Sequence, residues 1–186
     1  MQNKKMFFGI LLILSSMLAC QGILNTSKDS PPPGEVYLGL RNIWFTTKPE
    51  DLKITFEPKS KVPYAIVMDI GMDGNTATIV SSIIGDGSMY TSTGGGVIGG
   101  IGHENVRKAS VNFVKTADGF VDKMNLTTEF PLPSGNNIKF YLITPSGIYT
   151  TKEVDADVLA SGNHELSPLF LAGNDVITEL KITTGK

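Results

Sequence analysis

The segment from Gly94 to His103 (GGGVIGGIGH) is the part of this 186-residue chain whose residue types and spacing are best suited to binding a ligand. The pattern Gly94-x-Gly96-x-x-Gly99 matches the glycine spacing of dinucleotide-binding loops, and it lies between a predicted strand and a predicted helix. Backbone N–H groups at the start of a helix can hold a phosphate or a carboxylate. The candidate residues for this anion or small-ligand site are Gly94, Gly95, Gly96, Gly99, Gly100 and His103.

The same loop also has a purely structural interpretation. The strand before it belongs to an antiparallel meander, no acid follows on a parallel strand, and no lysine occupies a P-loop position, so a nucleotide is disfavoured. Glycines also let a backbone pass close over a sheet, in which case Val97 and Ile98 would insert into the core. The two interpretations, ligand site and close backbone packing, both stay open at this stage.

The two histidines of the chain are each followed by glutamate, as His103-Glu104 and His164-Glu165. These four side chains could form a metal site of two imidazoles and two carboxylates. Adjacent residues on a helix point in different directions, however, so at most three of them would converge. The favoured alternative is that each histidine caps a helix start or forms a hydrogen bond across a loop, and no metal or cofactor is expected.

Nucleophilic catalysis has little support. The chain has no Gly-x-Ser-x-Gly elbow, and the pair of Ser92 and His103 lacks an evident orienting acid. Asp69 and Asp86 flank the second predicted strand, where turn or strand-end roles are favoured over paired catalytic carboxylates.

The N-terminus has the pattern of a leader. Lys4 and Lys5 precede an apolar run of nine residues, 6–14, which is much shorter than the roughly 20 residues of a membrane-spanning helix. Residues 1–19 are therefore predicted to be a signal peptide. The one cysteine, Cys20, directly follows Ala19, and this placement resembles the lipobox of bacterial lipoproteins, although Met17 departs from the usual leucine. The alternative is an ordinary leader with an incidental cysteine.

The lipobox resemblance implies that Cys20 is diacylated and becomes the new N-terminus, which would anchor the chain stably in a membrane. Gln21 is not aspartate, which in enteric bacteria favours the outer membrane over the inner one. Residues 20–35 then form the lipidated cysteine and a tether, stiffened by three prolines at 31–33. Residues 36–186 form a single domain outside the cytoplasm.

Charge and composition exclude several classes of protein. Sixteen basic residues against 18 acidic ones give a net charge of −2, so the chain lacks the basic surface that a nucleic-acid binder needs. A single cysteine excludes an internal disulfide framework. Twenty glycines and 10 prolines indicate many tight turns and hence a sheet-containing domain.

The hydrophobic patterns predict an α+β domain with a five-stranded antiparallel sheet flanked by helices. Its predicted order is a short helix, a three-strand meander, a long amphipathic helix, a hairpin and a last helix. Trp44 and Phe45, beside Arg41, are either an exposed aromatic patch or, preferably, the edge of the core. The predicted elements are helix 47–52, strands 64–70, 76–84 and 88–93, helix 103–124, strands 138–144 and 148–154, and a helix from Ser167 that Gly173-Asn174 interrupts.

This order resembles the roadblock and profilin-like plan across residues 36–186, which implies terminal helices on one face of the sheet and the middle helix on the other. Three motifs resemble those of a widespread bacterial protein family, and this resemblance implies no particular activity. The motifs are STGGGVIGG (92–100) with His103-Glu104, FPLP (130–133) and LSPL (166–169).

Together these features predict a lipid-anchored, non-enzymatic interaction or assembly module of the bacterial cell envelope. Its expected partners are the membrane, through Cys20, and either another protein or a second copy of the chain. The alternative is a small-ligand or anion binder, or an enzyme, that uses the loop 94–102 and His103.

Overall fold

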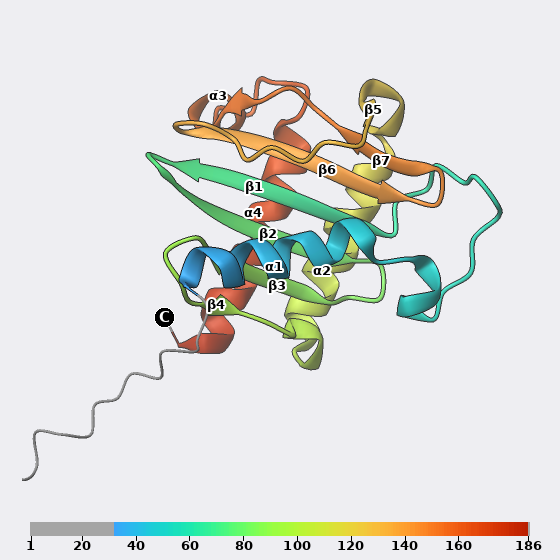
Figure 1. The fold of residues 1–186 in the computed structure, drawn as a ribbon, viewed down its shortest axis with the longest axis horizontal. Coiled ribbons are helices and arrows are strands. Elements are labelled where there is room, and N and C mark those ends of the chain that lie inside the picture. The colour runs from blue at the N-terminus through green and yellow to red at the C-terminus, as the bar shows by residue number, and fades with distance from the viewer. Residues whose placement is uncertain (1–31, 186) are drawn as a thin grey trace, which may run out of the picture. The chain divides into compact units, whose positions relative to one another are not determined.

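The structure is a computed structural model that describes residues 32–185 (Figure 1). The predicted signal peptide, Cys20 and the tether up to Pro31 lie outside the described residues. The helices are α1 (Pro33–Thr46), η1 (Pro49–Leu52), η2 (Gly100–Gly102), α2 (Glu104–Asp118), η3 (Val121–Lys123), α3 (Ala156–Ala160) and α4 (Ser167–Thr184). The strands are β1 (Ala65–Met72), β2 (Asn75–Ser82), β3 (Gly87–Thr91), β4 (Gly96–Val97), β5 (Asn125–Thr127), β6 (Asn137–Thr144), β7 (Gly147–Thr150) and β8 (Val154–Asp155).

The strands form one antiparallel sheet in the order β4-β3-β2-β1-β6-β7-β5, with β8 paired to β6. The predicted meander (β1–β3) and hairpin (β6–β7) are both present, so the α+β class and the antiparallel sheet are confirmed. The sheet has eight strands and not five. The three additional strands are only two or three residues long. Strands β4 and β5 lie in segments with no predicted strand, whereas the predicted strand 148–154 ends at Thr150 as β7 and its last residue, Val154, begins β8.

Helices cover both faces of the sheet, with α1 on one face and α2 and α4 on the other (Figure 1). Alternate residues of β1 serve the two layers: Ile66 and Met68 pack under α2 and α4, whereas Ala65 and Val67 face α1. The first and last long helices therefore lie on opposite faces. This differs from the roadblock and profilin-like plan, in which the terminal helices share a face.

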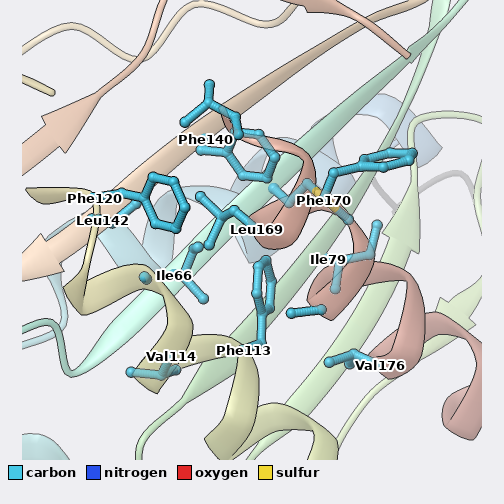
Figure 2. Packing of buried hydrophobic residues seen from close by; sticks show 14 of the residues in the cluster. Ile66, Ile79, Phe113, Val114, Phe120, Phe140, Leu142, Leu169, Phe170 and Val176 are labelled. Atoms are coloured by element: carbon cyan, nitrogen blue, oxygen red, sulfur yellow. The ribbon is translucent and has the colours of Figure 1, made fainter. Parts of the chain in front are cut away.

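The larger core lies between the sheet and the pair α2 and α4 (Figure 2). Phe113 of α2 and Leu169 of α4 are fully buried there against the strands. Gly173 lets α4 approach closely, because a Cβ at this position would lie 2.5 Å from the Met68 methyl group. The pair Gly173-Asn174 therefore does not interrupt α4, which runs unbroken to Thr184.

Helix α2 is shorter than the predicted 103–124 because it ends at Asp118, with Gly119 as its C-cap. The buried positions Phe120, Val121 and Met124 continue the helical spacing but lie in or beside the 3-10 turn η3. Hydrophobic spacing thus identified the buried face correctly and overran the helix end. The predicted short helix at 47–52 is confirmed as η1, where the Asp51 carboxylate accepts the Lys48 backbone N–H at 2.8 Å.

Helix α1 occupies a segment for which no regular element was predicted, and its first turn takes up residues 33–35 of the predicted tether. Between Pro33 and Thr46 the helix holds two glycines and only two charges, Glu35 and Arg41, so it shows no polar stripe. Proline at the first helical position and Glu35 in the first turn are the local signals that fit a helix start. Within residues 32–185, no helix has both the length and the apolar composition needed to cross a membrane.

Candidate functional site

The glycine-rich loop builds the β3–β4 hairpin. Gly94 and Gly95 have positive φ angles of 96° and 85° and form the turn, in which Thr91 donates its hydroxyl to the Gly94 carbonyl at 2.8 Å. Gly96 pairs with Tyr90, and a Cβ at Gly96 would lie 2.2 Å from the Met89 carbonyl oxygen. Only glycine fits this close approach, so the turn and the pairing account for three of the candidate residues.

The second half of the loop leads into α2 at equally close range. A Cβ at Gly100 would lie 2.5 Å from a Val106 methyl group, and the Gly99 N–H donates to the Ser88 hydroxyl at 3.2 Å. Val97 is half-buried against the core, as the structural interpretation predicted, but Ile98 is 64% exposed, so its predicted insertion into the core is wrong.

The two His-Glu pairs are not brought together. His103 is exposed just before α2, and its carbonyl accepts the Arg107 N–H. His164 accepts the Leu166 backbone N–H on Nδ1 at 3.1 Å, which is a hydrogen bond within the loop before α4. Neither histidine side chain caps a helix, so the predicted capping role is wrong. The glutamates pair with lysines, Glu104 with Lys108 at 2.7 Å and Glu165 with Lys123 at 3.6 Å. In residues 32–185 no three His, Cys, Asp or Glu side chains cluster in a way that could hold a metal ion.

The other motifs noted in the sequence stabilise the fold. Phe130 of the FPLP motif stacks on Phe45, with ring centroids 4.1 Å apart, and the Pro131 carbonyl accepts the Tyr141 hydroxyl. In the LSPL motif, the Ser167 hydroxyl donates to the Leu159 carbonyl at 2.7 Å. The Ser92 hydroxyl accepts the Thr76 N–H at 3.0 Å, so it fastens the hairpin to β2.

A buried polar network lies beneath α1, where the sequence suggested only a core edge. Arg41 is 2% exposed and donates to Asp69 Oδ2 from Nε at 2.9 Å and from Nη2 at 2.6 Å. Thr78 donates to Asp69 Oδ1 at 2.6 Å and also pairs with the Tyr37 hydroxyl at 2.8 Å. The expectation that Asp69 is a strand-end residue is therefore wrong, because it lies within β1 and is fully buried.

Burial dominates the titration behaviour of this network. It raises the pKa of the Asp69 carboxyl, an effect that the bonds from Arg41 and Thr78 partly offset. It also raises the pKa of Tyr37 to about 12, so this phenol stays neutral. The network is closed to solvent and satisfied internally, and it fixes how α1 sits on the sheet.

A groove of about 1110 Å³ opens at the C-terminal end of α1, on the same face of the sheet. Its walls are the segments 45–50 and 54–59 on one side and residues from 127–130 and 143–148 on the other. Aromatic rings form much of the lining. Phe45 stacks on Phe130, and the ring centroids of Phe56 and Tyr64 are 6.0 Å apart. The Tyr64 hydroxyl donates to the Thr47 carbonyl at 2.7 Å, which ties the wall to the sheet.

The rim of the groove is polar and electrically balanced. The positive charges of Lys48 and Lys59 balance the negative charges of Glu50 and Glu57. The exposed side chains of Thr55 and Thr128 lie on opposite walls. Sequence reasoning missed this groove because its walls come from four separate segments. The one signal in the sequence is the aromatic pair Trp44 and Phe45, whose preferred interpretation is the core edge. Both side chains are half-buried against the core.

Comparison with known proteins found no match: no family model, no curated protein and no solved structure is similar to this chain.

Proposed function

We propose that this chain is a lipid-anchored module of the bacterial cell envelope that works by binding a partner protein. The leader and Cys20 support the anchor, and the outer membrane is the favoured location. The groove between α1 and the β6–β7 side of the sheet supports the binding role, and it is the observation on which the proposal rests. Its volume exceeds the roughly 300–1,000 Å³ of typical small-molecule pockets.

The occupant of the groove that we propose is an extended, uncharged segment of the partner. A lining of Phe45, Phe56 and Phe130 favours apolar side chains. Two lysines and two glutamates on the rim cancel, so the groove does not favour a charged segment of either sign. Threonine hydroxyls on both walls can exchange hydrogen bonds with a peptide backbone.

The alternative is an anion or small-ligand site at the loop 94–102 and His103. Its backbone donors are partly committed, because the Gly94 N–H donates to the Thr91 carbonyl and the Gly99 N–H donates to Ser88. A phosphate cradle needs such N–H groups to be free. This observation favours the groove over the loop.

Photo-crosslinking in cells tests the proposal. A benzophenone amino acid replaces Thr55 or Thr128 on the groove walls, and the matched controls are the exposed Thr93 on the hairpin and Thr178 on α4. We expect the same discrete adduct from both groove positions and none from Thr178. The adduct should disappear when Phe56→Asp places a charge in the groove. Adducts from Thr93 alone would move the binding site to the glycine-rich loop and overturn the proposal.

Thermal melting with phosphates, nucleotides, divalent metals, sugars and small acids tests the alternative directly. A ligand at 100 times its Kd stabilises the folded state by about 2.7 kcal/mol. A stabilisation that His103→Ala abolishes would establish a small-ligand site at the loop. We expect no such stabilisation.

A further inference from the structure

Helix α1 presents an apolar surface away from the sheet. Val36, Leu38 and Ile43 are 44%, 41% and 57% exposed, and a Cβ at Gly39 would meet nothing within 4 Å. Val36 and Ile43 are seven residues apart and so lie on the same side of the helix, with Gly39 between them. A helix that is apolar on all sides is normally covered on all sides.

This outward surface carries almost no charge. Arg41, the one basic residue of α1, is turned inward to Asp69, which leaves Glu35 in the first turn as the only outward charge. The neighbouring sheet edge is equally neutral: Tyr37 packs on Tyr90 of β3, and the chain has no charged residue from Ser88 to Gly102. Moving this surface into a less polar environment therefore desolvates few charges.

The short stretch of chain between Cys20 and α1 limits the distance of α1 from the proposed anchor. Twelve residues, 21–32, separate Cys20 from the first residue of α1. The 13 residue steps from Cys20 to Pro33 span at most about 47 Å even when the chain is fully extended. If Cys20 is acylated, the first residue of α1 cannot move further than this from the bilayer.

We propose that the outward surface of α1, formed by Val36, Gly39 and Ile43 with Leu38 at its far margin, lies against the lipid bilayer. This inference rests on the acyl anchor of the proposed function and adds an orientation to it. The buried bonds of Arg41 and Tyr37 hold α1 rigidly on the sheet, so contact at α1 orients the whole domain. The groove begins at Phe45, at the end of α1, and so opens beside the membrane surface, where a membrane-associated partner can reach it.

The proposed contact of α1 is with the apolar part of the lipid surface and not with anionic headgroups. The basic side chains Arg107, Lys108 and Lys115 lie on α2, on the opposite face of the sheet. Contact through α1 is therefore apolar, and we expect it to persist at high salt. Contact through α2 would weaken as salt screens the charges.

The test uses the acylated protein in vesicles of phosphatidylethanolamine and phosphatidylglycerol. Asn42 on α1 and Asn112 on α2 are both exposed, and each is replaced by cysteine in a separate variant. A membrane-impermeant maleimide should label Asn112→Cys equally in vesicles and in detergent. We expect Asn42→Cys to be protected in vesicles and labelled in detergent, with protection unchanged in 1 M salt.

Trp44, the one tryptophan of the chain, gives a second readout in the unmodified sequence. It is half-buried against the core beside Ile43, so brominated lipids in contact with α1 should quench part of its fluorescence. The double variant Val36→Ser and Ile43→Ser should stay with the vesicles through Cys20 and lose this quenching.

The outcomes distinguish a failure of the acyl anchor from a failure of the bilayer contact. Release of the unmodified protein from the vesicles would refute the anchor, and the bilayer contact would fall with it. The Cys20→Ser variant should be released and is the reference for this outcome. Anchored protein with a freely labelled Asn42→Cys and unquenched Trp44 would overturn the contact alone. Oxidative dimerisation of anchored Asn42→Cys would show that a second copy covers α1, and this result also overturns the contact.

Discussion

Replacement of Arg41 by methionine tests whether the buried network holds α1 on the sheet. The change removes both bonds to Asp69 Oδ2, at 2.9 and 2.6 Å, and leaves a fully buried carboxylate with only the Thr78 hydroxyl. Removing one partner of a buried ion pair typically costs about 3–5 kcal/mol, against about 0–1 kcal/mol for a surface pair. Urea unfolding, followed by Trp44 fluorescence and far-UV circular dichroism, measures the loss.

A double variant separates the buried charge from the lost packing. Arg41→Met with Asp69→Leu removes both charges, and the Thr78 hydroxyl keeps Tyr37 as its partner. Apolar replacement of a whole buried pair is often neutral in stability or gains about 1–4 kcal/mol. We therefore expect the double variant to recover most of the free energy of unfolding that the single variant loses.

The stability that Arg41→Met loses should depend on pH with a definite sign. Burial raises the pKa of Asp69 in the folded protein, so its contribution to stability is full below the unfolded value and is lost as pH rises through the folded value. Arg41→Met removes a group that lowers this pKa, so the loss of stability should be largest at neutral pH and become smaller as the solution is acidified. A deficit below about 1 kcal/mol at neutral pH, or one that grows in acid, would refute the buried-pair argument.

Four variants, three at glycines and one at a serine, test the packing. Gly96→Ala should cost about 1–3 kcal/mol, because its Cβ would collide with the Met89 carbonyl at a φ of 153°, whereas Gly95→Asn, in an open αL position, should cost roughly 1 kcal/mol or less. Gly173→Ala should lower the Tm, because overpacking of about 1–3 kcal/mol outweighs a helix-propensity gain of about 1 kcal/mol. Ser110→Ala should leave the Tm unchanged or raise it, because the buried Ser110 hydroxyl lacks a partner. Differential scanning calorimetry checks all four, and a stabilised Gly173→Ala would contradict the close packing of α4.

The predictions that succeeded rest on regular spacing and on turn residues. The Asp73-Gly74 turn takes positive φ at both positions, as a tight hairpin between β1 and β2 requires. In α2, Val106, Ser110, Phe113 and Ala117 are all buried, as their three- and four-residue steps predicted. Such local signals do not depend on what the element packs against.

The predictions that failed depend on partners that are distant in sequence. Helix α1 buries an arginine because Asp69, 28 residues away, neutralises it, and no local pattern contains this information. Helix propensity treats Gly173 as a weak point, yet contact with Met68 makes it a packing requirement. The groove likewise exists only because the segments 45–59 and 127–148 meet across the sheet.

The glycine-rich loop shows that one local sequence pattern can fit two different roles. Its Gly94-x-Gly96-x-x-Gly99 spacing fits an anion site and a tight hairpin equally well in sequence. The structure uses Gly96 for close strand pairing with Tyr90 and Gly100 for close packing on Val106. Side chains at Gly95 and Gly99 would meet no close neighbour, but both residues have positive φ angles of 85° and 77°. Asparagine tolerates this conformation better than other residues, so Gly95→Asn, Gly99→Asn and His103→Ala test ligand binding at a small cost in stability.

Hydrogen exchange of the protein in its native membranes, compared with the purified protein in detergent, tests most directly which face of the domain is used. Backbone amides of α1 and of the groove segments 45–59 and 127–148 should exchange more slowly in the membrane. Amides of α2 and α4 should exchange at equal rates in both states. Protection confined to residues 94–103 would instead identify the glycine-rich loop as the functional site and contradict the proposed binding face.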